Sequence, residues 1–351
     1  MKKLIQLILL FLSLVIALLI CEGLTRSLKL APKLNWINPK APNSSFQLSS
    51  DPLLGYEFKK NEKRKEFNLY ESFPYTNEHG FRDYPRNIKK NKFRILLLGD
   101  SVVAGTGIRD LKKLISSQLQ LLLNCNNVEV MNIGVSGYNI IGENQLFKTI
   151  GIKFQPDILI HIITDNDFNA NNSMIHQVSL NSYSQSLITL IKTSDLLKFI
   201  LFTNNPIRNT FFKDFAKTNK HLGSMQTKSI ENALWELKKL TKEQGTKLIT
   251  ILWPSFLNKE VLPFSSIPEK NQLISHTLEK LKLPYHYINS TYPKSDNAFK
   301  AYTIGDYMHV NELGALYAAK GIKEILKQKE LDPLIFDNED NDKCLSEQVS
   351  F

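Results

Sequence analysis

The chain has 351 residues, of which 42% are hydrophobic and 22% are charged, and its formal net charge is +10. This length and balance allow a large buried core and exclude wholesale disorder. Lysines are interleaved with acids and asparagines and no nucleic-acid-binding motif is present, so we predict no nucleic-acid partner. The three cysteines are too scattered for a zinc site, and we predict no metal and no cofactor.

The first segment of the chain is apolar. Lys2 and Lys3 precede an uncharged stretch from Leu4 to Cys21. This stretch is near the lower limit for crossing a bilayer and is longer than the usual apolar core of a signal peptide. Because no small-residue cleavage site follows, we expect residues 1–21 to be an uncleaved transmembrane anchor, with a cleaved signal as the alternative. The domain that follows is expected outside the cytoplasm, although positive charges beyond the stretch weaken the orientation signal.

Residues 22–90 lack long periodic runs and are predicted to be a linker plus a segment packed on the main domain. From residue 91 to residue 330 the chain alternates apolar strand patterns with amphipathic helical patterns. The strand patterns lie at residues 93–99, 128–135, 157–164, 247–254 and 285–289. The helical patterns lie at residues 111–124, 144–154, 232–245, 271–282 and 312–329. This alternation predicts an α/β fold with a parallel sheet covered on both faces.

Two segments depart from this alternation. Residues 168–226 interrupt it with an apolar helical pattern at 184–202 and an Asn- and Lys-rich patch. We predict a lid or side subdomain there, with extra core helices as the alternative. Residues 331–351 are acidic and are expected to be disordered.

Polar residues follow the ends of the predicted strands, where open α/β sheets bind their ligands. These are Ser101 after the first strand, Gly137 and Asn139 after the second, Asp165, Asn166 and Asp167 after the third, and Asp306 and His309 before the last helix. A serine hydroxyl is a weak nucleophile until a base such as His309 takes its proton. Asp306 can orient that base, and the backbone N–H groups of Ser101 and Gly137 with the amide of Asn166 can stabilise an oxyanion. The pattern predicts acyl-transfer chemistry.

Four blocks of the sequence resemble the SGNH/GDSL hydrolase family. They are "LLGDSVVAGTGI", "NIGVSGYN", "PDILIHIITDNDF" and "DYMHVNELG", within residues 93–328. The resemblance implies a flavodoxin-like three-layer sandwich with a central parallel sheet. It implies that Ser101 is the nucleophile, that Asp306 and His309 complete a triad, and that Ser101, Gly137 and Asn166 form the oxyanion hole. The upstream "DPLLGY" and "TNEHGFRD" are similar to membrane-anchored bacterial members.

The third block departs from the family. Thr164 stands where a glycine is usual, and the carboxylate of Asp165 would oppose a developing oxyanion if it pointed inward. We predict a serine esterase acting on a small-molecule, lipid or glycan ester. The main competing function is that of an O-acyltransferase that uses the same triad on a cell-surface polysaccharide. A metal-dependent phosphoesterase and a non-catalytic glycan-binding module are also compatible with the residues at these strand ends.

Overall fold

A computed structural model gives the arrangement of the chain. It describes residues 2–31, 44–51, 54–65, 73–167, 190–191, 193–202, 206–211 and 230–327. The tail at 331–351 and most of the insertion at 168–226 therefore lie outside the described residues, and the predictions for them stay predictions.

The centre of the molecule is a five-stranded parallel sheet with strand order β4-β3-β5-β6-β9. Its strands are β3 (Phe93–Leu98), β4 (Val128–Asn132), β5 (Ile158–Ile163), β6 (Lys247–Leu252) and β9 (Tyr285–Tyr287). The first strand of the sheet lies between the second and the third, which is the flavodoxin-like order. In register, Ile95 is paired with Val130 on one side and with Ile158 on the other. All five strands are where the sequence predicts them.

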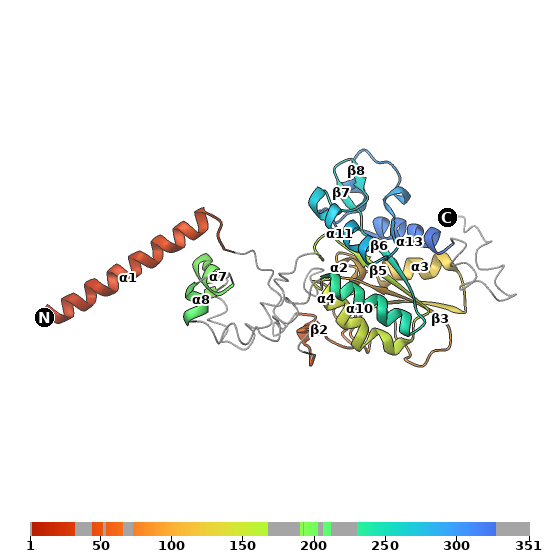
Figure 1. The fold of residues 1–351 in the computed structure, drawn as a ribbon, viewed down its shortest axis with the longest axis horizontal. Helices are drawn as coiled ribbons and strands as arrows, with labels where there is room; N and C mark the ends of the chain where they lie inside the picture. The colour runs from red at the N-terminus through yellow and green to blue at the C-terminus, as the bar shows by residue number, and fades with distance from the viewer. Residues whose placement is uncertain are drawn as a thin grey trace.

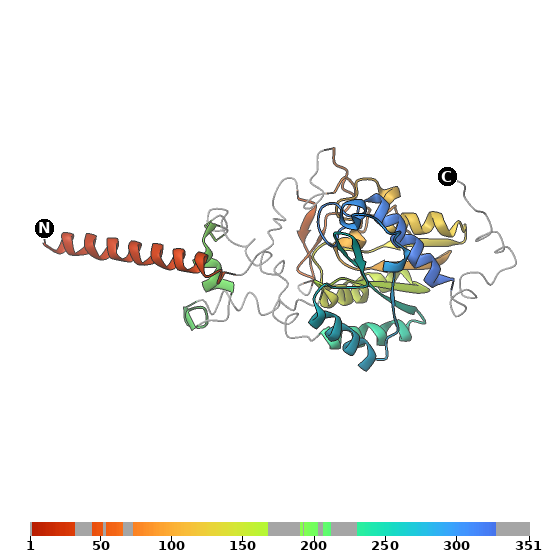
Figure 2. The ribbon, with the colours of Figure 1, turned by 90° about the horizontal axis from the view of Figure 1, so that it is seen from above.

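Helices cover both faces of the sheet, and this confirms the three-layer α/β sandwich (Figures 1 and 2). One layer holds α3 (Ile115–Leu123) and α13 (Glu312–Leu326), and the other holds α4 (Ile140–Thr149), α10 (Ile230–Glu243) and α11 (Pro268–Lys280). Alternate residues of β3 enter opposite cores, with Ile95 and Leu97 in the core that contains α3 and Leu96 and Leu98 in the core that contains α4. This is the two-residue period of a strand buried on both faces.

The remaining elements, apart from the first helix of the chain, are shorter. They are β1 (Phe46–Leu48), β2 (Tyr56–Phe58), α2 (Ser101–Ala104), η1 (Leu111–Lys113), η2 (Gly151–Phe154), α7 (Asp195–Phe202), α8 (Pro206–Phe211), β7 (Ser255–Leu257), β8 (Glu260–Leu262), η3 (Asn289–Thr291) and α12 (Ala298–Tyr302). The strands β1 and β2 form an antiparallel hairpin whose Phe46 and Phe58 are buried in the same core as Leu96. The part of segment 22–90 from residue 46 onward thus contributes to the domain core, whereas residues 22–27 continue the helix at the start of the chain.

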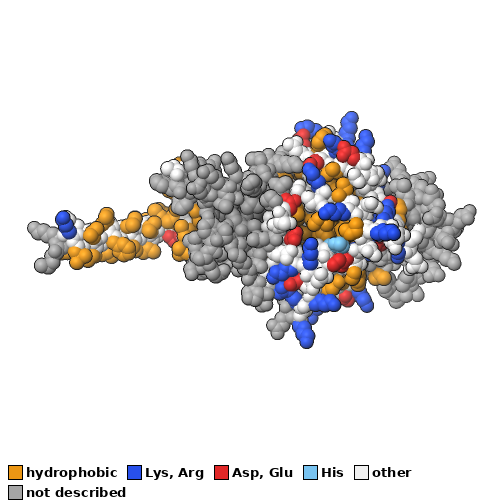
Figure 3. Space-filling model, turned by 90° about the horizontal axis from the view of Figure 1, so that it is seen from below, with side chains coloured by type: hydrophobic (Ala, Val, Ile, Leu, Met, Phe, Trp, Pro, Cys, Tyr) orange, Lys and Arg blue, Asp and Glu red, His pale blue; other side chains and the backbone are white. Residues whose placement is uncertain are grey.

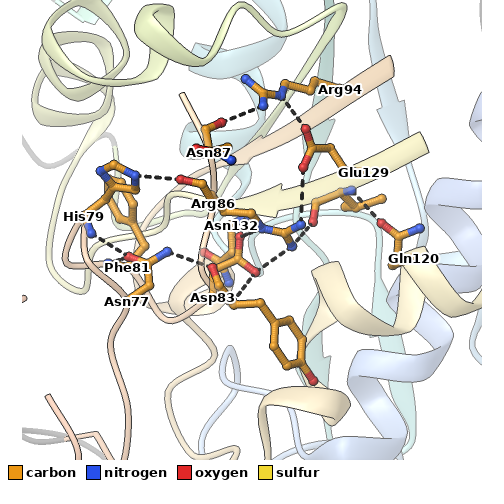
Figure 4. A network of polar contacts seen from close by, with 12 residues as sticks. Asn77, His79, Phe81, Asp83, Arg86, Asn87, Arg94, Gln120, Glu129 and Asn132 are labelled. Atoms are coloured by element: carbon orange, nitrogen blue, oxygen red, sulfur yellow. Dashed lines mark hydrogen bonds and ion pairs between the residues drawn. The ribbon is translucent and has the colours of Figure 1, made fainter. Parts of the chain in front are cut away.

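A polar network fastens residues 77–94 to the edge of the sheet (Figure 4). Arg86 donates two hydrogen bonds of 2.8 Å to the carboxylate of Asp83. Asp83 also accepts a hydrogen bond from the backbone N–H of Asn132 at the end of β4. Arg94 pairs with Glu129 across the strands β3 and β4. These buried, charge-assisted contacts fix the upstream segment against the strand that leads to the candidate site.

The helix α1 (Lys2–Ser27) precedes these elements and contains the predicted anchor. Its apolar side chains are exposed along its length (Figure 3), its mean hydropathy is 3.1 over the most apolar window, and none of that window is buried. The helix is long and apolar enough to cross a membrane, a property that signal sequences share. On the domain face in Figure 3, Lys and Arg side chains are spread among Asp and Glu.

Candidate active site

Ser101 lies where β3 ends, at the first position of the short helix α2. Asp100 caps this helix by accepting a 2.9 Å hydrogen bond from the backbone N–H of Val102. Gly105 ends it with a φ of 75°, a left-handed conformation that glycine adopts without strain. The sharp strand-to-helix turn places Ser101 at the carboxyl edge of the sheet, where it is 8% exposed.

The loop after β4 packs closely against α2. A side chain at Gly134 would place its Cβ 2.3 Å from the backbone nitrogen of Ala104, so only glycine allows this close approach. The amide of Asn132 donates a 2.7 Å hydrogen bond to the carbonyl oxygen of Val103. These two contacts fix the helix that carries Ser101 against the neighbouring strand.

The structure brings together three residues that the sequence singles out. His309 Nε2 lies 2.8 Å from Ser101 Oγ, although 208 positions separate the two residues. His309 Nδ1 lies 2.8 Å from Asp306 Oδ2. The imidazole therefore bridges a hydroxyl and a carboxylate in one hydrogen-bonded row.

The loop that carries His309 is tied down from several directions. Asp306 Oδ1 accepts hydrogen bonds from the backbone N–H groups of Met308 and His309, at 2.9 and 2.6 Å. The indole N–H of Trp253, just after β6, donates to the carbonyl oxygen of Met308 at 2.9 Å. Trp253 was not predicted from the sequence, where its signal is a large amphipathic ring at a strand end.

The contact between His309 and Asp306 shifts the pKa values of both residues toward their charged forms. Burial alone would lower the pKa of His309, but the hydrogen bond and charge of Asp306, with the charge of Asp100, outweigh it and raise that pKa. Burial alone would raise the pKa of Asp306, and its bonds to the side chain and backbone of His309, with that of Met308, lower it instead. The site thus stabilises an imidazolium beside an ionised Asp306.

Asn166 lies beside Asp100, the residue that precedes Ser101. Its side-chain oxygen accepts a hydrogen bond from the hydroxyl of Thr164, which also lies 3.2 Å from Asp100 Oδ2. A hydrogen bond from Asn166 helps to lower the pKa of Asp100, against the rise that burial causes. Asp100 Oδ2 is in turn 3.3 Å from Ser101 Oγ. Thr164, which the sequence marked only as a departure, links the ends of β3 and β5.

The loop after β4 contains the other predicted residues. Gly137 has a φ of 81°, and its neighbour Ser136 lies with its hydroxyl 3.2 Å from that of Thr106, shortly after α2. Asn139 caps α4 by accepting from the backbone N–H of Gly142. The structure thus places Gly137 in the loop next to α2 and gives Asn139 a structural role.

The side chain of Asp165 contacts Ser265 and Lys270, which lie before and within α11. Its carboxylate accepts a 3.1 Å hydrogen bond from Ser265 Oγ, and Lys270 Nζ lies 3.5 Å from Oδ2. Burial raises the pKa of Tyr307, and the charge of Asp165 and a hydrogen bond with it add to the rise. The charge that the sequence left as a difficulty is therefore compensated by Lys270.

A buried group of titratable residues lies below the site. His161 Nε2 and Glu143 Oε2 are 2.8 Å apart, and both side chains are fully buried. Burial lowers the pKa of His161 to about 3, while burial and then the charge of Asp100 raise that of Glu143. Asp167 accepts from the backbone N–H of Thr164, and burial raises its pKa. Burial thus favours the neutral form of both carboxyls.

Within the described parts of the chain, no three His, Cys, Asp or Glu side chains are grouped so that they could hold a metal ion. A phosphoesterase would need such a group from Asp100, Asp165, Asp167, Asp306 and His309. In the structure, Asp306 is instead hydrogen-bonded to the imidazole of His309 and Asp165 is paired with Lys270. Asp167 accepts a hydrogen bond from a backbone N–H. The chemistry that this edge of the sheet supports is proton transfer to and from Ser101.

The chain is similar in structure to GDSL-type ester hydrolases. One is described as a lipolytic protein of the G-D-S-L family from Desulfitobacterium hafniense, with 11% identity, a TM-score of 0.39, and coverage of 67% of this chain and 100% of the other. Another is an acetylxylan esterase from Geobacillus stearothermophilus, with 13% identity, a TM-score of 0.39 and coverage of 68% and 97%. A third is a two-domain esterase active on acetylated mannans, with 12% identity, a TM-score of 0.41 and coverage of 73% and 50%.

No family model and no curated protein matches the chain.

Proposed function

We propose that this protein is a serine-dependent ester hydrolase of the SGNH type, held at a membrane by α1. The observation that carries the proposal is the row in which His309 lies 2.8 Å from both Ser101 Oγ and Asp306 Oδ2. A hydroxyl, an imidazole and a carboxylate in this order are the parts of a nucleophile, its base and the group that orients the base.

In the proposed reaction, His309 Nε2 takes the proton of Ser101 as Oγ attacks the ester carbonyl. Asp306 holds the proton on Nδ1 and stabilises the imidazolium, in keeping with the raised pKa of His309. The imidazolium then gives its proton to the leaving alcohol, and an acyl group remains on Ser101. Water, activated by the same imidazole, releases the acid and restores the serine.

The oxyanion of each tetrahedral intermediate needs donors aimed at it. We assign this role to the backbone N–H groups of Ser101 and Gly137 and to the amide of Asn166. The first position of α2 supports the assignment for Ser101, because the first N–H groups of a helix have no intrahelical partner. The assignment of Asn166 is supported by its hydrogen bond to Asp100, which places it next to Ser101.

The test compares wild type with Ser101→Ala on short-chain p-nitrophenyl esters, with Ser275→Ala on α11 as the matched control. We expect Ser101→Ala to lose activity by about 10⁴-fold or more, and Ser275→Ala to keep it. Equal rates for wild type and Ser101→Ala would refute the nucleophile assignment. Adding oligosaccharide acceptors to the wild-type reaction distinguishes a hydrolase from a transferase, because only a transferase places the acyl group on the sugar.

A further inference from the structure

The described part of the insertion contacts the end of the apolar helix α1. In Figures 1 and 2, α7 lies beside the C-terminal end of α1, with α8 next to α7, and both lie apart from the sheet. The two helices α1 and α7 are far apart in the sequence. The contact joins the C-terminal end of α1 to the N-terminal end of α7, and the side chains at these two ends explain it.

Glu22 makes this contact. Its carboxylate accepts hydrogen bonds from the backbone N–H groups of Asp195 and Leu196, each at 2.9 Å, and from Ser194 Oγ at 2.8 Å. It thus caps the start of α7 from another helix, as a carboxylate at a helix N-terminus does favourably. Arg26 strengthens the joint, because it donates to Glu22 and to the carbonyl oxygen of Thr193, both at 2.6 Å.

The position of Glu22 sets the level of α7 relative to a bilayer. The uncharged stretch from Leu4 to Cys21 is about 27 Å long at ~1.5 Å per helical residue, close to the ~30 Å of a hydrocarbon core. Glu22 is the next residue, so it lies at the boundary between hydrocarbon and headgroups. A helix capped by Glu22 starts at that boundary.

The composition of α7 fits this level. Its sequence "DLLKFILF" is apolar except for Asp195 and Lys198, which form an ion pair with each other. Nearby apolar side chains are left exposed, with Leu190 at 54% and Ile207 at 48%. Because Glu22 joins the start of α7 to α1, the same hydrocarbon that covers α1 can cover these side chains.

We infer that α7, with Leu190 and Ile207, is a second membrane-contacting surface that Glu22 docks on the anchor, and that its partner is the lipid interface. The inference rests on the anchor in the proposed function and not on the esterase activity. Residue 168, where the insertion begins, is two positions after Asn166. The insertion thus begins in the sequence close to the candidate oxyanion donor, and its described helix α7 lies at the anchor.

The test uses the full chain reconstituted in phosphatidylcholine vesicles that contain a photoactivatable phosphatidylcholine, followed by peptide mapping of the lipid adducts. We expect adducts in α1 and also in residues 190–211. In Glu22→Ala, adducts in 190–211 should fall by about tenfold while those in α1 remain, because a charge-assisted helix cap is lost. Glu243→Ala, on the exposed end of α10, is the matched control and should label like wild type.

Wild-type labelling decides the question even if Glu22→Ala fails to fold. Adducts in α1 without adducts in 190–211 would overturn the inference and leave the anchor intact. The absence of adducts from α1 would overturn the anchor itself, and the inference with it. Protection of 190–211 that grows with the protein-to-lipid ratio would identify a second copy of the chain as the occupant and would also overturn the inference.

Discussion

The guanidinium of Arg82 donates a 2.6 Å hydrogen bond to the carbonyl oxygen of Gly105, the residue that ends the helix beginning at Ser101. A second hydrogen bond, of 2.8 Å, reaches the carbonyl oxygen of Ile108. The Arg82 side chain is fully buried. Arg82 is thus a positioning residue: it binds the end of α2 opposite Ser101 and does not contact Ser101 or His309.

Replacing Arg82 by Met should lower the free energy of unfolding by about 2–4 kcal/mol, because buried carbonyl groups lose their donor. We expect kcat to fall more than KM rises, since α2 loosens while the substrate surface stays. Urea unfolding and ester hydrolysis measure the two effects. Arg109→Met, an exposed arginine of the same loop, is the control and should stay within about 0.5 kcal/mol of wild type. Unchanged stability of Arg82→Met would show that the contacts are dispensable.

The pH dependence of hydrolysis should report His309. Its pKa is raised above 6.5, so kcat/KM should rise with pH through a midpoint above that value as the imidazole becomes neutral. The stability that this shift provides is complete below pH 6.5 and is lost as the pH rises through the raised pKa.

Asp306→Asn removes the charge that raises the pKa of His309. We expect the midpoint of the pH profile to move down and the rate to fall by about 10³–10⁴-fold. The full profile of kcat/KM against pH, measured for both proteins, checks both effects. A midpoint that does not move would mean that Asp306 does not set the charge of the imidazole.

The pair Asp165–Lys270 should matter through charge. Lys270→Met leaves the carboxylate uncompensated close to Asn166, and kcat should fall several-fold, a coupling of about 1 kcal/mol. Adding Asp165→Asn should restore most of the loss. Lys280→Met, near the end of the same helix α11, is the control for losing a lysine. If the double variant is no faster than Lys270→Met, the loss is not electrostatic.

Glu143→Gln should preserve the fold, since burial raises the pKa of Glu143 and so favours its neutral form against His161, and the amide has the same shape. The pKa of Glu143 is raised in the folded state. Its contribution to the free energy of unfolding is therefore complete below pH 4.5 and is lost as the pH rises through the raised pKa. Gln removes this loss. We therefore expect the free energy of unfolding of the variant to gain on wild type as pH increases. Parallel curves for the two proteins, from urea unfolding between about pH 5 and pH 9, would contradict the neutral state.

The sequence was sufficient for the strands and for the meeting of Ser101, Asp306 and His309. Continuous apolar runs marked the buried strands, and in a parallel sheet their carboxyl ends meet at one edge. Contacts such as that of Arg82 with Gly105 were not predictable in this way. They depend on which loop folds over which helix, and neither periodicity nor residue spacing records that.

Packing also decided the environment of Asp165. The sequence showed a carboxylate beside Asn166. Its compensation by Lys270 depends on how α11 packs on the sheet, which the sequence pattern does not record. The contact between Glu22 and Leu196, which are 174 positions apart, likewise depends on packing and could not be predicted from the sequence. The roles of Gly137 and Asn166 as oxyanion donors remain predictions.

The central claim is that Ser101 is the nucleophile activated by His309, and covalent trapping tests it most directly. A fluorophosphonate is added to the full chain, and the modified residue is mapped by mass spectrometry in wild type, Ser101→Ala and His309→Ala. We predict a single adduct on Ser101 that is absent from Ser101→Ala and forms far more slowly in His309→Ala. An adduct on another serine, or labelling of Ser101 at the same rate without His309, would contradict the account.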